Sequence, residues 1–432
     1  MSIPHGYRAA SILWILLLTG LASLTTPGRA GDFSAEARQA RQQLRDRVMP
    51  YWYDTAIDWT QGGYRLCDDA RTGRCEPPEK QLVTQARMVW GFSLAHRQGW
   101  STTERDYRKA AAHGVRFLRE RMKDPLHGGY FWSTTLDGAP RDTRKRLYGE
   151  AFVIYGLVEF FRASQDRSAL DDAMALFREI QRRAHDTRHG GWTEHFERDW
   201  TPLPLRHPEA IVEVAGLKSA NTHLHLMEAF SELYDVSRDP QVRTALEESL
   251  RLNRQFFYPA DPARSAFHVH PDWSPVTDPS SAGLSYGHNV EFAWLMLRAE
   301  DVLGQPRSWA HFHNHVTHAL KYGTDPVRGG VYNRGQGNDP ATDRDKVWWV
   351  QAEMLAALAH GLAHSPEQPG YRDALGKLWL WIHSAQADPK TGIWLDTVRA
   401  DGTPKSTALA HNWKANYHDV RALHLFAETF AR

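Results

Sequence analysis

A glycine-rich turn that recurs along the chain constrains the fold more than any other feature of this sequence. Each copy has one or two glycines, then an aromatic residue within two positions, then a short extended stretch. The copies are Gly62-Gly63-Tyr64, Gly128-Gly129-Tyr130, Gly190-Gly191-Trp192, Gly329-Gly330-Val331-Tyr332 and Thr391-Gly392-Ile393-Trp394. Successive copies lie 62 to 66 residues apart, except for one interval of 139 residues that has room for a degenerate copy near Phe267–Trp273. We therefore expect six related units.

Apolar residues between these turns follow helical spacing. In the stretch 151–162 they are Phe152, Tyr155, Leu157, Val158 and Phe161. The same steps of three and four occur in parts of 212–233 and in 290–303, 347–362 and 418–430. Each unit thus holds about two helices and a small hairpin.

Six such units can each bury an inner helix if they close into a ring. We therefore predict an all-α fold, an (α/α)6 barrel with short β-hairpins at one end, with an open helical solenoid as the alternative. No linker or change of composition follows residue 31, so 31–432 is expected to be one catalytic domain.

The first thirty residues have the composition of a signal peptide. Arg8 provides a positive charge, 9–24 is an apolar stretch, and Gly28-Arg29-Ala30 offers small residues for cleavage after Ala30. An uncleaved anchor is the alternative, but sixteen apolar residues fall short of the roughly 20 that span a bilayer. We expect an exported protein, periplasmic or secreted, with no stable membrane association after cleavage.

Loss of Arg8 and Arg29 with this leader would leave 50 basic against 51 acidic residues. Such a balance gives no electrostatic reason to bind nucleic acid, and we expect a monomer. The two cysteines, Cys67 and Cys75, lie in a short turn-rich segment. In an oxidising compartment this arrangement predicts a disulfide that closes a hairpin.

Four helical segments carry polar residues among apolar ones. They are 221–229 (NTHLHLMEA), 285–294 (SYGHNVEFAW), 346–353 (KVWWVQAE) and 413–421 (WKANYHDVR). A single histidine on a helix is more often packed or solvated than functional. Here separate units place His or Glu near the start of an inner helix, and a closed barrel would bring these positions into one cavity.

These segments, with Arg87-Met88-Val89-Trp90 and KRLYGEAF at 145–152, resemble the N-acylglucosamine 2-epimerase superfamily, and within it the cellobiose 2-epimerases most closely. The motifs occur in the expected order over nearly all of the chain after residue 30. The resemblance implies an (α/α)6 barrel and a sugar 2-epimerase that needs no metal or other cofactor. Its substrate would be a small-molecule sugar, of the cellobiose or the mannose/glucose type.

The resemblance also implies roles for individual residues. His418 matches the general base at C2, His288 the partner acid/base with Glu291 supporting it, and His225 a third cavity histidine. Arg87 matches the residue that holds the enolate oxygen, and Tyr148 and Asn221 match substrate-orienting groups. The sugar-contacting wall is matched by Trp348, Trp349, Glu353 and Trp413.

The chemistry explains these residue types. Epimerisation at C2 requires the open-chain aldehyde, a base that removes the C2 proton, and a second base that returns a proton to the opposite face. The intermediate is a cis-enediolate, whose negative oxygen needs a permanent cation such as arginine. Histidine suits both proton transfers because its pKa lies near neutral pH.

Several alternatives stay open. An aldose–ketose (mannose) isomerase shares the enediolate and differs only in returning the proton to C1. A glycoside hydrolase or lyase on the same barrel would need two carboxylates, here Glu291 and Glu353. A metal could bind through His223 and His225, or through His311, His313, His315 and His318, although His223 and His225 diverge on a helix. A sugar-binding protein without catalysis is the last alternative.

Overall fold

The computed structural model of the chain describes residues 33–208, 213–278 and 283–430. The predicted leader, 1–30, lies outside these residues. Phe33–Arg432 forms one compact unit. Within its described part, no helix combines the length and the apolar character needed to cross a membrane.

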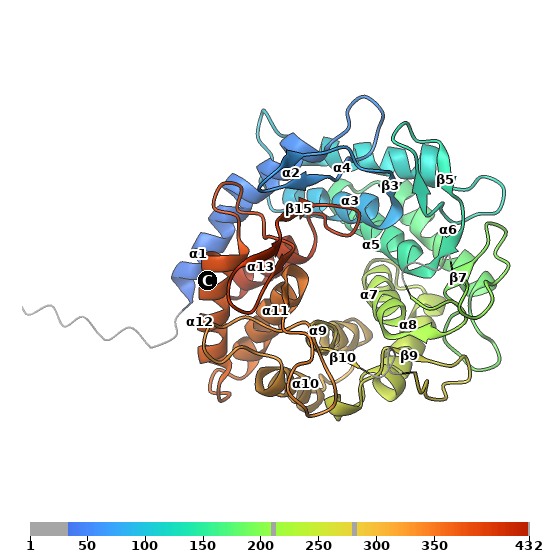
Figure 1. Cartoon of the computed structure of the whole chain (residues 1–432). Coiled ribbons are helices and arrows are strands. Elements are labelled where there is room, and N and C mark those ends of the chain that lie inside the picture. The colour runs from blue at the N-terminus through green and yellow to red at the C-terminus, as the bar shows by residue number, and fades with distance from the viewer. Residues whose placement is uncertain (1–32, 209–212, 279–282, 431–432) are drawn as a thin grey trace, which may run out of the picture. The chain divides into compact units, whose positions relative to one another are not determined.

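Helices in two concentric layers form a closed ring (Figure 1). The inner helices are α3 (Leu82–Arg97), α5 (Leu147–Ser164), α7 (Ala220–Ser237), α9 (Tyr286–Leu303), α11 (Trp348–His364) and α13 (His418–Phe430). The outer helices are α1 (Ser34–Gln43) with α2 (Met49–Ala56), α4 (Tyr107–Phe117), α6 (Arg167–Arg183), α8 (Pro240–Leu252), α10 (Trp309–Tyr322) and α12 (Tyr371–Trp381). Shorter helical turns extend four of the outer helices, at Leu44–Val48, Leu118–Met122, Asn253–Phe257 and Ile382–Gln386, and one more lies at Pro262–Arg264. The predicted (α/α)6 barrel is confirmed.

The two layers differ in how they bury side chains. On the inner helix α5 every residue from Leu147 to Phe160 is buried, because one face meets the outer layer and the other meets the barrel interior. The outer helix α6 buries only a stripe that includes Leu170, Phe177 and Ile180. A helix that is buried all round and a helix with one apolar stripe are the two patterns expected of such layers.

Short strand pairs link each unit to the next. A two-residue strand just before an inner helix pairs with a strand that follows the next outer helix. The pairs are β3 (Lys80–Gln81) with β4 (Ser133–Thr134), β6 (Lys145–Arg146) with β7 (His195–Phe196), β8 (Lys218–Ser219) with β9 (His268–Val269), β10 (Leu284–Ser285) with β11 (Arg334–Gly335), and β12 (Lys346–Val347) with β13 (Thr397–Val398).

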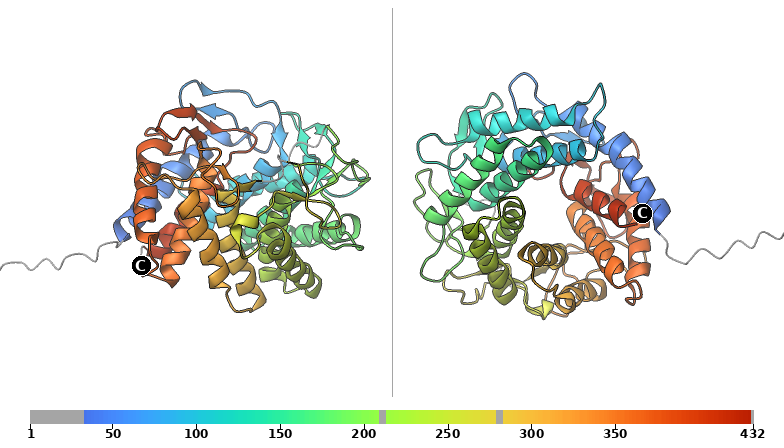
Figure 2. Two further views of the ribbon diagram at one scale, coloured as in Figure 1. Left: turned by 60° about the horizontal axis from the view of Figure 1, so that its bottom comes forward. Right: turned by 180° about the vertical axis from the view of Figure 1, so that it is seen from behind.

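The sixth pair closes the ring. β15 (Ala408–Ala410), which precedes the last inner helix, pairs with β1 (Asp68–Asp69) of the first unit. The remaining strands extend three of these pairs: β2 (Gly73–Arg74), β5 (Pro140–Asp142) and β14 (Pro404–Ser406). An open solenoid would leave its first and last units unpaired, so this alternative was wrong. Seen from behind, the same ring of helices is visible around the barrel axis (Figure 2).

The fourth unit has lost its glycine turn but kept its geometry. In other units a backbone N–H just beyond the turn donates to the carbonyl that ends the outer helix, as in Phe131 to Met122 and Tyr332 to Gly323. Ala266 donates to Phe257 in the same way, and β9 follows at His268. The degenerate copy predicted near Phe267–Trp273 is therefore present.

The two cysteines are joined. Cys67 and Cys75 form the predicted disulfide across the β1–β2 hairpin, with their Cα atoms 5.1 Å apart. The N–H of Cys75 also donates to the carbonyl of Cys67. Because β1 is the strand that pairs with β15, this disulfide braces the hairpin that closes the ring.

A buried lysine–aspartate pair holds the glycine turn in four units. The pairs are Lys80–Asp58, Lys145–Asp124, Lys218–Asp186 and Lys346–Asp325. In the last of these, Lys346 Nζ lies 2.8 Å from Asp325 Oδ2 and also donates to the carbonyl of Gly329. The next residue, Gly330, has φ of +78°, and a Cβ there would lie 2.8 Å from the Trp381 ring, so only glycine fits.

We expect Lys346→Met to lower the free energy of unfolding by about 3 to 5 kcal/mol, because the buried Asp325 charge and the Gly329 carbonyl lose their partner. Urea denaturation measures this. Lys377→Met is the control: its ion pair with Asp373 is exposed and should contribute about 1 kcal/mol or less. In the double variant with Asp325→Asn, part of the loss should be recovered; if the double variant is no more stable than Lys346→Met, the unpaired charge is not the cause.

Candidate active site

An eight-residue segment repeats at the start of all six inner helices and positions the site. The segments are KQLVTQAR (80–87), KRLYGEAF (145–152), KSANTHLH (218–225), LSYGHNVE (284–291), KVWWVQAE (346–353) and KANYHDVR (414–421). Five of them begin with lysine. The alignment of these six segments is visible in the sequence, but a repeat defined by the glycine turns alone does not reveal it.

Equivalent positions of the segment have equivalent places in the barrel. The fifth residue is histidine in the fourth and sixth units, His288 and His418. The eighth residue forms a layer of mostly charged side chains: Arg87, Phe152, His225, Glu291, Glu353 and Arg421. Five of the segments begin on a two-residue strand, and the sixth begins four residues after β15. Because each segment ends within the first two turns of an inner helix, these residues all lie at the same end of the barrel.

One cavity at this end brings together the residues that the sequence predicted. It is lined by Arg87, Tyr148, Asn221, His225, His288, Glu291, Trp348, Trp349, Trp413 and His418. Asn221, His288, Trp349 and Trp413 are partly exposed at its mouth, whereas Arg87, His225, Glu291 and His418 are buried deeper. Every predicted site residue except Glu353 lines this cavity.

Glu353 lies in a different place from the one predicted. It was expected on the sugar-contacting wall, but it lies behind His418, and its side chain is 1% exposed. Glu353 Oε1 accepts from His418 Nδ1 at 2.6 Å, and Oε2 accepts from the indole N–H of Trp294 at 3.1 Å. Its contacts therefore orient His418.

His225 has the same kind of support. Its Nδ1 lies 2.8 Å from Glu228 Oε2, and Glu228 is itself bonded to Tyr417 and Arg421. An ionised carboxylate only accepts, so each of these carboxylates places the ring proton on Nδ1. The nitrogen left for a ligand is then Nε2 in both His225 and His418.

Glu291 also departs from expectation. It was predicted to support His288, but its Oε1 accepts from Arg421 Nη2 at 2.7 Å. His288 Nδ1 is buried and has no hydrogen-bond partner among the described residues. His288 is instead placed by packing, with its ring 4.7 Å from that of Trp349.

Burial controls the protonation of these groups. Burial, reinforced by the nearby Arg87, holds the pKa of His418 well below its usual value. Burial, with the neighbouring His225, lowers the pKa of His288 to about 3. The pKa of His225 is also lowered by burial, although Glu228 opposes the shift. All three imidazoles are therefore neutral at pH 7 and able to accept a proton.

Arg87 is a cation without a matching acid. Its Nη2 donates to the Tyr148 hydroxyl at 3.0 Å and its Nη1 to the Trp413 carbonyl at 3.1 Å, and its guanidinium stacks 4.2 Å from the Phe152 ring centre. Its Nε is buried with no partner, and within residues 33–208, 213–278 and 283–430 no carboxylate pairs with it. The inner helices also begin at this cavity, so their positive dipole ends add to its field. The site favours a developing anion.

The histidines considered as metal ligands have other partners. His223 is the sixth residue of its segment, and its Nε2 accepts the N–H of Trp192 in the glycine turn. Gln85, Glu150 and Gln351 accept the equivalent N–H in their own units. His311, His313, His315 and His318 bond separately to Tyr258, Tyr371, Pro259 and Gly337. These contacts hold the histidines in the fold, and neither set of histidines considered as metal ligands directs its ring nitrogens to a common point.

Glu291, Glu353 and His418 do place ligand atoms within 4.8 Å of one another. The guanidinium of Arg421 already bonds to both carboxylates of this group. The same geometry disfavours a hydrolase, whose two carboxylates must flank a glycosidic bond rather than share one cation.

Comparisons with known proteins agree with this geometry. The family model described as N-acylglucosamine 2-epimerase (GlcNAc 2-epimerase) matches residues 62–422. A cellobiose 2-epimerase of Bacteroides fragilis is 28% identical over 392 residues, covering 89% of this chain and 96% of that protein. The structure of cellobiose 2-epimerase from Spirochaeta thermophila superposes with a TM-score of 0.81 at 32% identity, over 92% of this chain and 98% of that one.

A D-mannose isomerase of Thermobifida fusca is also similar, with 28% identity over 328 residues, 71% of this chain and 74% of that protein. The family model and these relatives extend over both the barrel and the cavity, and they confirm the resemblance inferred from the motifs. The chain belongs to the N-acylglucosamine 2-epimerase family.

Proposed function

We propose that this protein is a sugar 2-epimerase that acts on a reducing-end aldose by moving a proton at C2. The observation that carries the proposal is that two neutral histidines from alternate units, His288 and His418, line one cavity together with the uncompensated cation Arg87. The similarity to cellobiose 2-epimerases supports a disaccharide substrate, and mannose or glucose is the smaller alternative.

The reaction follows from these groups. An acid/base pair first opens the sugar ring to the aldehyde. Neutral His418, oriented by Glu353, then takes the C2 proton through Nε2. The electron pair moves to the carbonyl oxygen, and Arg87 stabilises the resulting enediolate. His288 approaches from a unit two positions away in the ring. It takes the O1 hydroxyl proton when the ring opens and returns that proton to the other face of C2, and His418 gives its own proton back to O1 when the ring closes.

Aromatic rings form the wall against which the sugar would lie. The Trp349 ring lies 4.7 Å from His288 and 5.8 Å from His418, so it spans the space between the two bases. Trp413 lies 6.4 Å from Tyr148 on the side nearest Arg87. A pyranose stacked on such rings would present its reducing end to the histidines.

The test is incubation of the purified protein with cellobiose, mannose or glucose in heavy water. We expect a 2-epimer that carries deuterium at C2, as observed by NMR. A ketose with deuterium at C1 would instead identify the aldose–ketose isomerase that the Thermobifida fusca relative represents. Cleaved glycosidic bonds, or no exchange with any of the three sugars, would contradict the proposal.

The pH dependence of kcat/KM reports the free enzyme's essential groups. Because the pKa of His288 is about 3 and that of His418 is also lowered, both bases stay deprotonated well below pH 6. We therefore expect kcat/KM to change less than about twofold between pH 7 and 5.5.

The unfolded chain takes up protons on its histidines below about pH 6.5, so the fold itself loses stability over the same range. Circular dichroism at each pH confirms that the enzyme is folded. An acid limb centred near pH 6.5 in folded enzyme would contradict the shifted histidines.

We also propose that the protein is exported, from the leader-like composition of residues 1–30. When the full chain is expressed in a bacterium, we expect cleavage after Ala30 and recovery outside the cytoplasm, measured by N-terminal sequencing and cell fractionation. Recovery of intact chain from the cytoplasm alone would oppose this proposal.

A further inference from the structure

Arg421 lies beneath the cavity and joins three carboxylates from three inner helices. Its Nη2 lies 2.7 Å from Glu291 Oε1 and 2.8 Å from Glu353 Oε1, and its Nη1 bonds to Glu228. All four side chains are 5% exposed or less. This residue was absent from the sequence-based site, although it is the eighth residue of its segment, equivalent to Arg87 and His225.

Two of the three carboxylates hold a histidine. Glu228 bonds to His225 Nδ1, and the same Oε1 atom of Glu353 bonds to both His418 Nδ1 and Arg421 Nη2. Each histidine keeps its proton on Nδ1 only while its carboxylate is ionised and correctly turned. Arg421 fixes the rotamer of both carboxylates through hydrogen bonds from opposite ends of one rigid guanidinium.

Three buried carboxylates would not stay in this arrangement without a cation. Burial, with the nearby Glu353, already raises the pKa of Glu291. Burial alone would also raise the pKa of Glu228, but Arg421 and His225 bring it below its ordinary value. Without the guanidinium, protonation of Glu228 would turn an acceptor into a donor and reverse the tautomer of His225.

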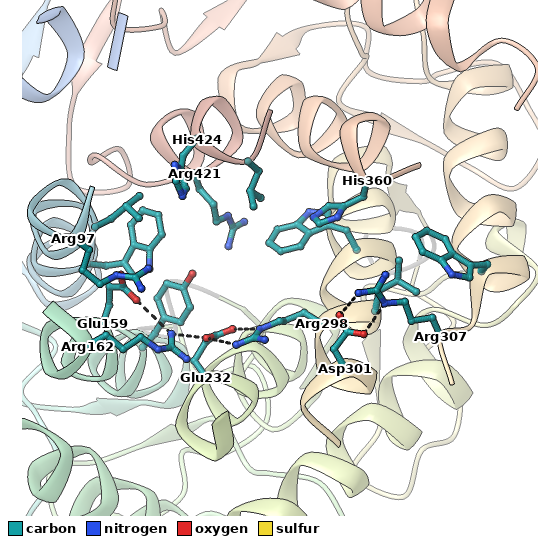
Figure 3. Close-up of a pocket in the computed structure, with 17 residues that line it drawn as sticks. Arg97, Glu159, Arg162, Glu232, Arg298, Asp301, Arg307, His360, Arg421 and His424 are labelled. Carbon is teal, nitrogen blue, oxygen red and sulfur yellow. Dashed lines mark hydrogen bonds and ion pairs between the residues drawn. The ribbon is translucent and has the colours of Figure 1, made fainter. Parts of the chain in front are cut away.

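The other side of Arg421 lines a second cavity, at the end of the barrel where the inner helices finish. Figure 3 shows its guanidinium directed into this space, opposite Arg162, Glu232 and Arg298. The second cavity has a volume of about 250 Å³. Arg421 therefore lies between the second cavity and the carboxylates that it binds, and a small cation could reach its position without passing the sugar.

We propose that Arg421 is a positioning residue for the epimerisation: by binding Glu228, Glu291 and Glu353 together, it fixes the tautomers of His225 and His418 and so presents Nε2 of both rings to the sugar. This inference rests on the proposed function, since it assumes that His418 acts as a base. Arg421 itself does not touch the cavity that holds the reacting carbon.

The test is chemical rescue of the Arg421→Ala variant. We expect kcat to fall on the order of 10- to 100-fold, as for other groups that orient a reacting side chain. Guanidinium at a low, non-denaturing concentration should enter from the second cavity and restore at least part of the rate, while sodium at equal ionic strength should not. Arg421→Lys, which keeps the charge but cannot span three carboxylates, should retain intermediate activity.

Arg298→Ala is the matched control. Arg298 lines the same second cavity, but its partners are Glu232 and Asp235, which have no contact with the histidines. We expect its kcat to change little and not to respond to guanidinium. Equal rescue of both variants would overturn the proposal, as would an Arg421→Ala enzyme within threefold of the wild-type kcat.

A second readout does not depend on activity. Side-chain ¹⁵N NMR of the wild-type protein should show His225 and His418 protonated on Nδ1, and Arg421→Ala should lose this state unless guanidinium is present. Unchanged tautomers would overturn the role of Arg421. If the wild type shows no C2 exchange with any sugar, the proposed epimerase function is wrong. The tautomer measurement still decides whether Arg421 positions His225 and His418. Should Arg421→Ala not fold, Arg421→Gln and Arg421→Lys provide the same comparison.

Discussion

Replacement of either His288 or His418 by glutamine is expected to reduce epimerisation on the order of 10²- to 10⁴-fold, while each variant still exchanges the C2 proton of one epimer. The reason is geometric: the two histidines occupy the same segment position in alternate units and so approach the cavity from different sides. The loss of one base leaves the other able to remove and return a proton on its own face. The measurement is deuterium incorporation at C2, started separately from the gluco and the manno epimer.

The two variants should be complementary in this experiment. If His288→Gln exchanges only one epimer, His418→Gln should exchange only the other. His311→Gln serves as the control, since His311 bonds to the Tyr258 carbonyl in the outer layer and should leave both activities intact. Equal exchange of both epimers by one variant would show that a single base serves both faces, and the two-base mechanism would be wrong.

Arg87→Met is expected to lower kcat by about 10³-fold, the cost of removing a donor aimed at a developing oxyanion. The free energy of unfolding of Arg87→Met should be equal to or higher than that of the wild type. Arg87 is a buried charge without an acidic partner in the described part of the chain, so its removal relieves a desolvation cost that offsets the lost bonds to Tyr148 and Trp413. Steady-state kinetics and urea denaturation measure the two effects.

Arg97→Met is the matched control on the same helix. Arg97 ends α3 at the opposite end of the barrel and pairs with Glu159. Its loss should reduce stability slightly and leave kcat close to that of the wild type. An Arg87→Met enzyme that keeps more than a tenth of the wild-type kcat, or that changes only KM, would remove Arg87 from its assigned role.

The fold followed from the sequence because its repeat is local. A glycine turn with positive φ and a helix with apolar residues every three or four positions are both visible without tertiary contacts. Helix α13 begins at His418 and ends at Phe430, the range that periodicity predicted. The beginning of α7 was less clear, because helical spacing was predicted only for parts of 212–233. In the structure β8 comes first, and the Ser219 hydroxyl caps the helix by accepting the N–H of Thr222.

The site was predicted less completely. Motifs identified the residues that line the cavity, but not the bonds among them. Arg421 reaches from α13 to carboxylates on α7, α9 and α11, and no spacing along one helix reveals which neighbours a long side chain meets across a ring. For the same reason Glu353 was assigned to the sugar rather than to His418, and Glu291 to His288 rather than to Arg421.

The pairing of β1 with β15 has a consequence for biosynthesis. Five of the six units can form while the chain is still being made, but the hairpin near residue 68 finds its partner strand only after residue 410 has been added. His418 and Arg421 come later still, in the last helix. A chain truncated just before β15 would retain most of its helices but lack the base, its orienting cation and the seam of the ring, so catalysis can begin only after the last inner helix has been added.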